Sequence, residues 1–309
     1  MFYIVGVFHL SQYLGEEYYL NNNIYGNNLM CSCLGTFSLI SGYLIGLKYT
    51  ANSAKEILYF YKKRVIRFYP LFLLSAILLY IIGFNDFNQT LNALLGLSPF
   101  LIPRPYTLWY ISMIMTFYLI TPIVLRKNKS IMSLVIIMAI VIFSRFIKLD
   151  GRYIFNLFLY LIGLNIGHLQ RTNIIKINRK VLLKNVFTKI LLISILCIYI
   201  IMLIILQEYN RGLFRIITNI TGTFILVLGV VCLPNQLFNR RRTIINFLAY
   251  TSMSCYLFHR FVYYIILSIY QPKITIILML YLFFIALPLC FVFSYYIQTL
   301  YDKGVKIKS

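Results

Sequence analysis

The sequence predicts an all-α polytopic membrane protein, folded as a bundle of about ten transmembrane helices. The 309-residue chain is 61% hydrophobic and has a mean hydropathy of +0.83, which is more apolar than soluble domains are. Its apolar residues gather in stretches near the bilayer-spanning length of about 20 residues, separated by short clusters of Lys and Arg. We therefore expect one membrane-embedded domain over residues 1–309.

The apolar stretches define the segments that we expect to lie in the membrane. These segments are 1–14, 29–47, 65–84, 107–125, 131–149, 153–169, 187–206, 213–233, 246–270 and 274–300. The first is shorter than a full span, so we expect its helix to be incomplete at its start by roughly six residues. A further apolar stretch, Leu91–Ile102, is short and contains Pro99, which is typical of a re-entrant or interfacial piece.

The basic residues are concentrated in alternate loops. The chain has 29 Lys and Arg against 7 Asp and Glu, a net charge of +22. A basic excess on one side of the membrane marks the cytoplasmic loops, so we expect a cell-membrane protein with both termini in the cytoplasm. The same placement argues against a nucleic-acid partner. The basic stretches are Lys48–Arg67, Arg126–Lys129, Arg171–Lys189, Arg240–Arg242 and Lys303–Lys308.

Ionisable side chains interrupt several of the apolar segments, notably His9, His259 with Arg260, and Arg145. Ionisable groups at membrane depth are costly and tend to serve function, and an imidazole can act as a general base. His9 therefore either packs between helices or carries chemistry. Arg260 projects about 100° away from its neighbour His259 on a helix, so the two need not act together. The acidic residues fall in loops or at segment ends. Ion-coupled transporters usually bury a carboxylate at membrane depth, so this placement argues against such a transporter.

Two further patterns suggest binding. Arg64 and Arg67 are three residues apart, so they share a helix face that suits phosphate groups, although they also fit an ordinary membrane anchor. Trp109 begins a segment at the outer interface, where aromatic residues commonly anchor a protein. The six cysteines lack the additional nearby ligands that a metal site needs, so we expect no metal.

Together these motifs resemble the membrane-bound acyltransferase 3 family, which modifies cell-surface sugars. The elements occur in the family's order and extend over nearly the whole chain. They are Gly6-Val7-Phe8-His9, Ser41-Gly42-Tyr43-Leu44-Ile45, Lys63–Pro70, Trp109 with Tyr118 and Pro122, and Tyr256-Leu257-Phe258-His259.

The resemblance implies an O-acyltransferase that moves an acyl group, typically acetyl from acetyl-CoA, to a hydroxyl of a surface polysaccharide such as capsule, lipopolysaccharide or exopolysaccharide. It implies that His9 is the catalytic base and that Arg64 and Arg67 lie near the phosphates of acyl-CoA, which is a donor substrate rather than a bound cofactor. Further candidate site residues are Trp109, Tyr118 and His259.

The chain departs from the family pattern in two places. The family's arginine upstream of the first histidine would fall before Met1. The Glu-Glu pair that many members carry after the tryptophan is replaced by Ile114 and Met115. Two other functions remain open on the sequence: a glycan transporter or flippase that does not transfer acyl groups, and an assembly partner of glycan synthases.

Overall fold

A computed structural model describes residues 2–20, 23–126, 129–144, 149–174, 186–208, 212–232 and 242–305. All regular elements in these ranges are helices, which confirms the predicted all-α class. Four of the described helical stretches are long and apolar enough to cross a membrane: Ile24–Lys48, Ala54–Ile81, Leu108–Arg126 and Thr275–Val305. The number of about ten transmembrane helices stays a prediction.

The helices follow the expected segments closely in order. The elements are η1 Ile4–Phe8, η2 Leu10–Tyr13, η3 Glu16–Tyr18, α1 Ile24–Lys48, α2 Ala54–Ile81, α3 Phe87–Leu94, α4 Leu108–Arg126, α5 Lys129–Phe143, α6 Gly151–Arg171, α8 Val186–Glu208, α9 Gly212–Cys232, α11 Arg242–Ile269, α12 Thr275–Tyr281, η4 Leu282–Ala286 and α13 Leu287–Val305. The last residues of segments 131–149 and 213–233 include positions outside the described ranges.

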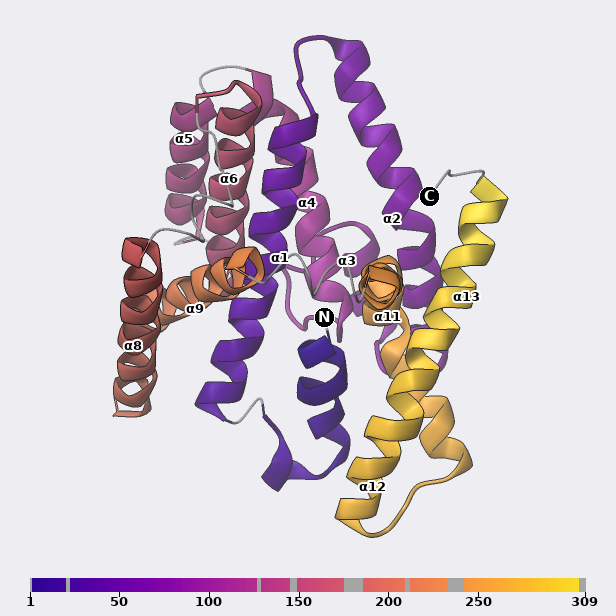
Figure 1. Ribbon diagram of the computed structural model, residues 1–309. Coiled ribbons are helices and arrows are strands. Elements are labelled where there is room, and N and C mark those ends of the chain that lie inside the picture. The colour runs from indigo at the N-terminus through magenta and orange to yellow at the C-terminus, as the bar shows by residue number, and fades with distance from the viewer. Residues whose placement is uncertain are drawn as a thin grey trace.

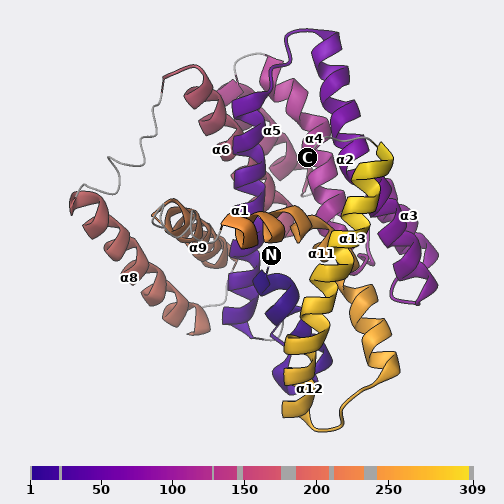
Figure 2. The same cartoon turned by 45° about the vertical axis from the view of Figure 1, so that its right-hand side comes forward.

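The bundle is arranged around α1 (Figure 1). Helices α5 and α6 lie on one side in Figure 1, α4 lies between α1 and α2, and α2, α11 and α13 form the other side of the molecule. Helices α8 and α9 lie side by side at one edge (Figure 2). The N-terminal residues 4–8 pack between α1 and α11, which places this short segment inside the bundle.

Helices α1 and α6 pack backbone against backbone through glycines. A Cβ atom at Gly42 would lie 2.0 Å from the carbonyl oxygen of Tyr160, and one at Gly163 would lie 2.0 Å from that of Leu39. Small residues at this spacing let two helix backbones approach closely. Such packing stabilises helix pairs in a bilayer, where the hydrophobic effect does not drive helices together. Four residues further along both helices the contacts repeat, because a Cβ atom at Gly46 would meet Leu164 and one at Gly167 would meet Tyr43. Helices α1 and α6 therefore run parallel, as the predicted alternation of loop sides requires.

The structure differs from the prediction at the start of α2 and within segment 1–14. The third segment was expected to begin at residue 65, but α2 begins at Ala54, because the Ser53 hydroxyl accepts a hydrogen bond from the Glu56 amide and caps the helix. The basic run Lys62–Arg67 therefore lies within α2 and not before its first residue. Segment 1–14 is not one α-helix: a π-helix, Ile4–Phe8, is followed by a 3-10 helix, Leu10–Tyr13.

The glycine contact gives the first testable prediction. Gly163→Ala places a methyl group against the α1 backbone, which cannot rotate away, so we expect a loss of about 1–3 kcal/mol and a lower thermal midpoint in detergent. Gly229→Ala in α9 is the matched control, since a Cβ there meets nothing within 4 Å. A Gly163→Ala protein that unfolds at the control's temperature contradicts the close α1–α6 packing.

Candidate active site

His9, His259 and Arg260 converge in the interior of the bundle. The Nη2 atom of the Arg260 guanidinium lies 3.1 Å from Nδ1 of His9, and the centroids of the two imidazole rings lie 4.7 Å apart. The exposed fractions of these side chains are 8% for His9, 0% for His259 and 4% for Arg260. The two histidines therefore share one buried site, although they are far apart in the sequence.

The irregular N-terminal helix aims two side chains at this site. The His9 amide donates to the Ile4 carbonyl, a π-type bond that widens the turn, and a 3-10 turn follows directly. Residues three apart project to the same side of a 3-10 helix, so His9 and Gln12 both reach Arg260. The Gln12 side-chain oxygen accepts from the Arg260 guanidinium at 2.6 Å. Isolated π turns of this kind often occur at functional sites.

The turn before α4 supplies the third partner of Arg260. The Thr107 hydroxyl accepts from Arg260 Nε at 2.6 Å, and the Thr107 carbonyl accepts from the Tyr256 hydroxyl at 3.0 Å. Thr107 has a positive φ of 63°, an uncommon conformation for a β-branched residue. Both polar groups of this strained residue are thus used in the site. We call His9, Gln12, Thr107, His259 and Arg260 the histidine–arginine cluster.

The helix geometry left open whether His259 and Arg260 act together, and the structure brings both into one cluster. Their directions do diverge along α11, but His9 enters between them and contacts both. Helix geometry alone does not predict a contact with a residue from a distant segment, such as His9. The long arginine side chain also reaches back across the turn, where its guanidinium lies 5.2 Å from the Tyr106 ring.

Arg64 occupies a separate site lined with aromatic rings. Its guanidinium carbon lies 5.3 Å from the ring of Tyr49, 5.5 Å from that of Phe60 and 5.2 Å from that of Tyr118. Its Nε is buried and has no hydrogen-bond partner. Rings around a cation orient it by cation–π attraction while leaving its donors available. Arg64 is thus held in place with donor capacity unused.

A cavity of about 100 Å³ adjoins Arg64, which we call the Arg64 cavity. Its lining is mostly apolar, with Phe68 and Tyr118 on one side and Leu95 and Gly96 from the turn after α3 on another. Arg67 is not part of this lining. It lies exposed, 5.9 Å from the Phe68 ring, so only one arginine of the predicted pair faces the cavity.

Residues that carry hydroxyl groups lie between the two sites. Tyr118 pairs with Ser41 at 3.1 Å, and Tyr110, two helical turns earlier on α4, pairs with Ser38 at 3.3 Å. The ring of Tyr110 lies 5.9 Å from that of Tyr256, which borders the histidine–arginine cluster. We call these five residues the polar seam. From Tyr110 to Tyr118 it extends for about 12 Å along α4.

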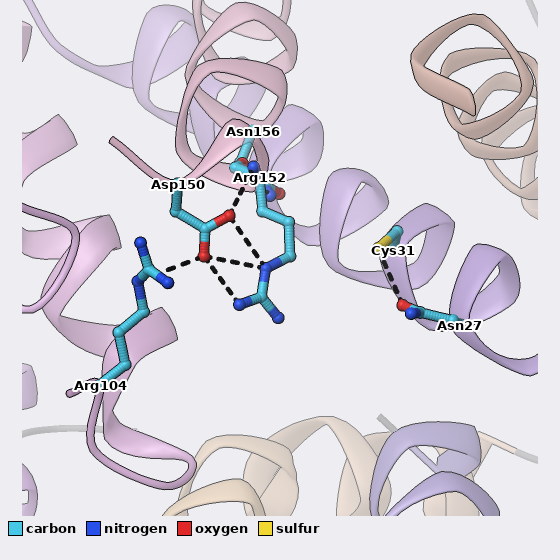
Figure 3. A network of polar contacts seen from close by, with 6 residues as sticks. All are labelled: Asn27, Cys31, Arg104, Asp150, Arg152 and Asn156. Atoms are coloured by element: carbon cyan, nitrogen blue, oxygen red, sulfur yellow. Dashed lines mark hydrogen bonds and ion pairs between the residues drawn. The ribbon is translucent and has the colours of Figure 1, made fainter. Parts of the chain in front are cut away.

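Trp109 lies beside a charged group at the start of α6. The Arg152 guanidinium carbon is 4.3 Å from the Trp109 ring, and the Arg152 side chain also donates to both carboxylate oxygens of Asp150 (Figure 3). Arg104 lies 3.4 Å from the same carboxylate. Burial alone would raise the pKa of the Asp150 carboxyl, but the hydrogen bonds and charges of the two arginines hold it below its usual range.

Hydrogen bonds link the polar seam to Arg104, Asp150 and Arg152, which we call the Asp150 group. Asn156 donates to the Arg152 carbonyl at 2.7 Å and accepts from the Ser38 hydroxyl at 2.9 Å. The Trp109 ring therefore packs against Arg152, which belongs to a group of two arginines and one carboxylate. Sequence reasoning missed this group, as it missed Gln12 and Thr107, because polar residues in loops carry no period that would pair them.

A family model described as an acyltransferase domain, that of the acyltransferase 3 family, matches residues 1–298. Neither a curated protein nor a solved structure gave a match. The match covers nearly all of the chain, and the apolar helices agree with a membrane protein. The chain therefore belongs to the acyltransferase 3 family of membrane acyltransferases.

Proposed function

We propose that this protein transfers an acyl group, in particular acetyl from acetyl-CoA, to a hydroxyl group of a surface polysaccharide. The observation that carries the proposal is the histidine–arginine cluster. Attack by a hydroxyl on a thioester needs a group that removes the hydroxyl proton and donors that stabilise the developing oxyanion. The buried imidazoles of His9 and His259 suit the first task, and the Arg260 guanidinium suits the second.

The Arg64 cavity suits the donor. A coenzyme A thioester carries its phosphates at one end and its acyl group at the other. Guanidinium groups bind phosphate oxygens through several hydrogen bonds, and Arg64 has donors to spare. An acyl group bound near the histidine–arginine cluster and phosphates bound near Arg64 would lie at the two ends of the polar seam. Arg67, exposed one turn further along α2, is the second phosphate contact in this proposal.

The direction of transfer follows from the charge alternation of the loops. We propose a cell-membrane location with both termini in the cytoplasm, which puts Arg64 on the cytoplasmic side with acyl-CoA. Tyr256, Thr107 and the histidine–arginine cluster then lie towards the outer half of the bundle, nearer to a surface polysaccharide. Trp109 and the Asp150 group occupy the same outer half, where a sugar ring would approach.

The role of His9 is tested by His9→Ala. We expect membranes with this variant to lose acetyl transfer from labelled acetyl-CoA to polysaccharide by about 100-fold or more, since general acid–base groups contribute factors of this size. His168→Ala, which removes a histidine at the end of α6, is the matched control and should retain transfer. Full activity of His9→Ala contradicts the assignment. Polysaccharide export without any acetyl-CoA dependence in the parent protein favours the flippase alternative.

Donor binding is tested by Arg64→Ala. Loss of a charged hydrogen bond to phosphate costs about 1.5–3 kcal/mol, so the KM for acetyl-CoA should rise roughly tenfold to 100-fold with a smaller change in kcat. Lys62→Ala, an exposed cation on the same helix, is the matched control. Equal KM values in the two variants would remove Arg64 from the donor site and leave it as a membrane anchor.

A further inference from the structure

The two imidazoles of the histidine–arginine cluster have opposite hydrogen-bonding patterns. His9 presents Nδ1 to the Arg260 guanidinium at 3.1 Å. A guanidinium only donates hydrogen bonds, so this nitrogen of His9 is the one with the lone pair. The neutral His9 ring then carries its proton on Nε2. With Nδ1 already occupied by Arg260, the remaining nitrogen of His9 is a donor.

His259 has the reverse arrangement. Its Nδ1 lies 2.8 Å from the carbonyl oxygen of Tyr256, one turn back on α11. A carbonyl only accepts hydrogen bonds, so Nδ1 of His259 carries the proton and Nε2 holds the lone pair. This Nε2 is buried and has no hydrogen-bond partner. The site therefore contains one free imidazole lone pair, next to an imidazole whose free nitrogen is a donor.

Most polar groups around this acceptor have hydrogen-bond partners. Arg260 uses Nε and one terminal nitrogen on Thr107, His9 and Gln12, and the Tyr256 hydroxyl is also paired. Leaving a buried acceptor without a partner costs free energy, and such groups in folded proteins call for an explanation such as catalysis. The His259 ring is fully buried 4.7 Å from His9, so its lone pair belongs to the site already described.

Given the proposed acyl transfer, we infer that Nε2 of His259 is the atom that accepts the proton of the attacking hydroxyl group, while Nε2–H of His9 donates to the reacting carbonyl oxygen. The hydroxyl oxygen bonds to the acyl carbon as its proton passes to His259. The carbon–sulfur bond of the thioester then breaks, and the departing thiolate takes that proton from the imidazolium and leaves as a thiol. The role that the family resemblance gives to His9 is thereby divided between two histidines.

Two variants of His259 separate catalysis from structure. His259→Asn keeps an N–H donor near the Nδ1 position, so the bond to the Tyr256 carbonyl can survive, but it has no basic nitrogen. His259→Gln places an amide near the Nε2 position and also lacks a base. Both are assayed in membranes with acetyl-CoA and polysaccharide taken from cells that lack this protein, and thermal midpoints in detergent report folding.

We expect both variants to reduce kcat by a factor of about 100 or more while the KM for acetyl-CoA stays near that of the parent. The residual rate should rise about tenfold per pH unit, as hydroxide replaces the missing base. His9→Gln, which retains a donor near Nε2, should keep more activity than His9→Asn. This order is expected only if His9 acts as a donor.

The inference is overturned by either His259 variant with a kcat within threefold of the parent, or by a low kcat without the rise with pH. It is also overturned if His9→Gln and His9→Asn are equally inactive. If the parent protein itself transfers no acetyl group from acetyl-CoA, the proposed function fails instead, so the two failures are distinguishable. Should His259→Asn fold poorly, His259→Gln and the two His9 variants still decide the matter.

Discussion

The hydrogen bonds of Arg260 hold together three parts of the chain that nothing in the sequence connects. Arg260 and His9 are 251 positions apart, and Thr107 belongs to a third segment. A guanidinium inside a membrane protein is costly unless its donors are satisfied, and a charged hydrogen bond contributes about 1.5–3 kcal/mol. These bonds therefore fix the N-terminal segment, which is too short to cross a bilayer alone, against α11 and the start of α4. The position of His9 inside the bundle depends on this anchoring.

The glycine contact between α1 and α6 is the second constraint. With Gly42 and Gly163 holding one face of α1 against α6, Ser38 and Ser41 are positioned to pair with Tyr110 and Tyr118 of α4. The polar seam thus depends on how closely two helix backbones approach. It joins the Arg64 cavity to the histidine–arginine cluster, so packing in the middle of the bundle sets the separation between the two ends of the proposed donor.

The residues that the sequence singles out as candidates are those with local signals. His9 and His259 interrupt apolar segments, and Arg64 lies in a recognisable basic run next to Pro70. Arg260 carried the same signal of a charge at membrane depth, but its partnership with His9 depends on tertiary structure. The early start of α2 was missed because the helix continues beyond its apolar part, where hydropathy no longer marks it. Thr107 and Gln12 gave no signal, since their roles come from a strained turn and a 3-10 turn.

We propose that Arg260 and the Tyr256 carbonyl set opposite tautomers in the two histidines. Nitrogen-15 NMR of histidine-labelled protein in lipid measures this directly, because the chemical shift of each ring nitrogen shows whether it carries a proton. The chain has only three histidines, so single His→Asn variants assign the signals. We predict a neutral His9 protonated on Nε2 and a neutral His259 protonated on Nδ1. The same tautomer in both rings, or a His9 ring protonated on Nδ1, would contradict the account.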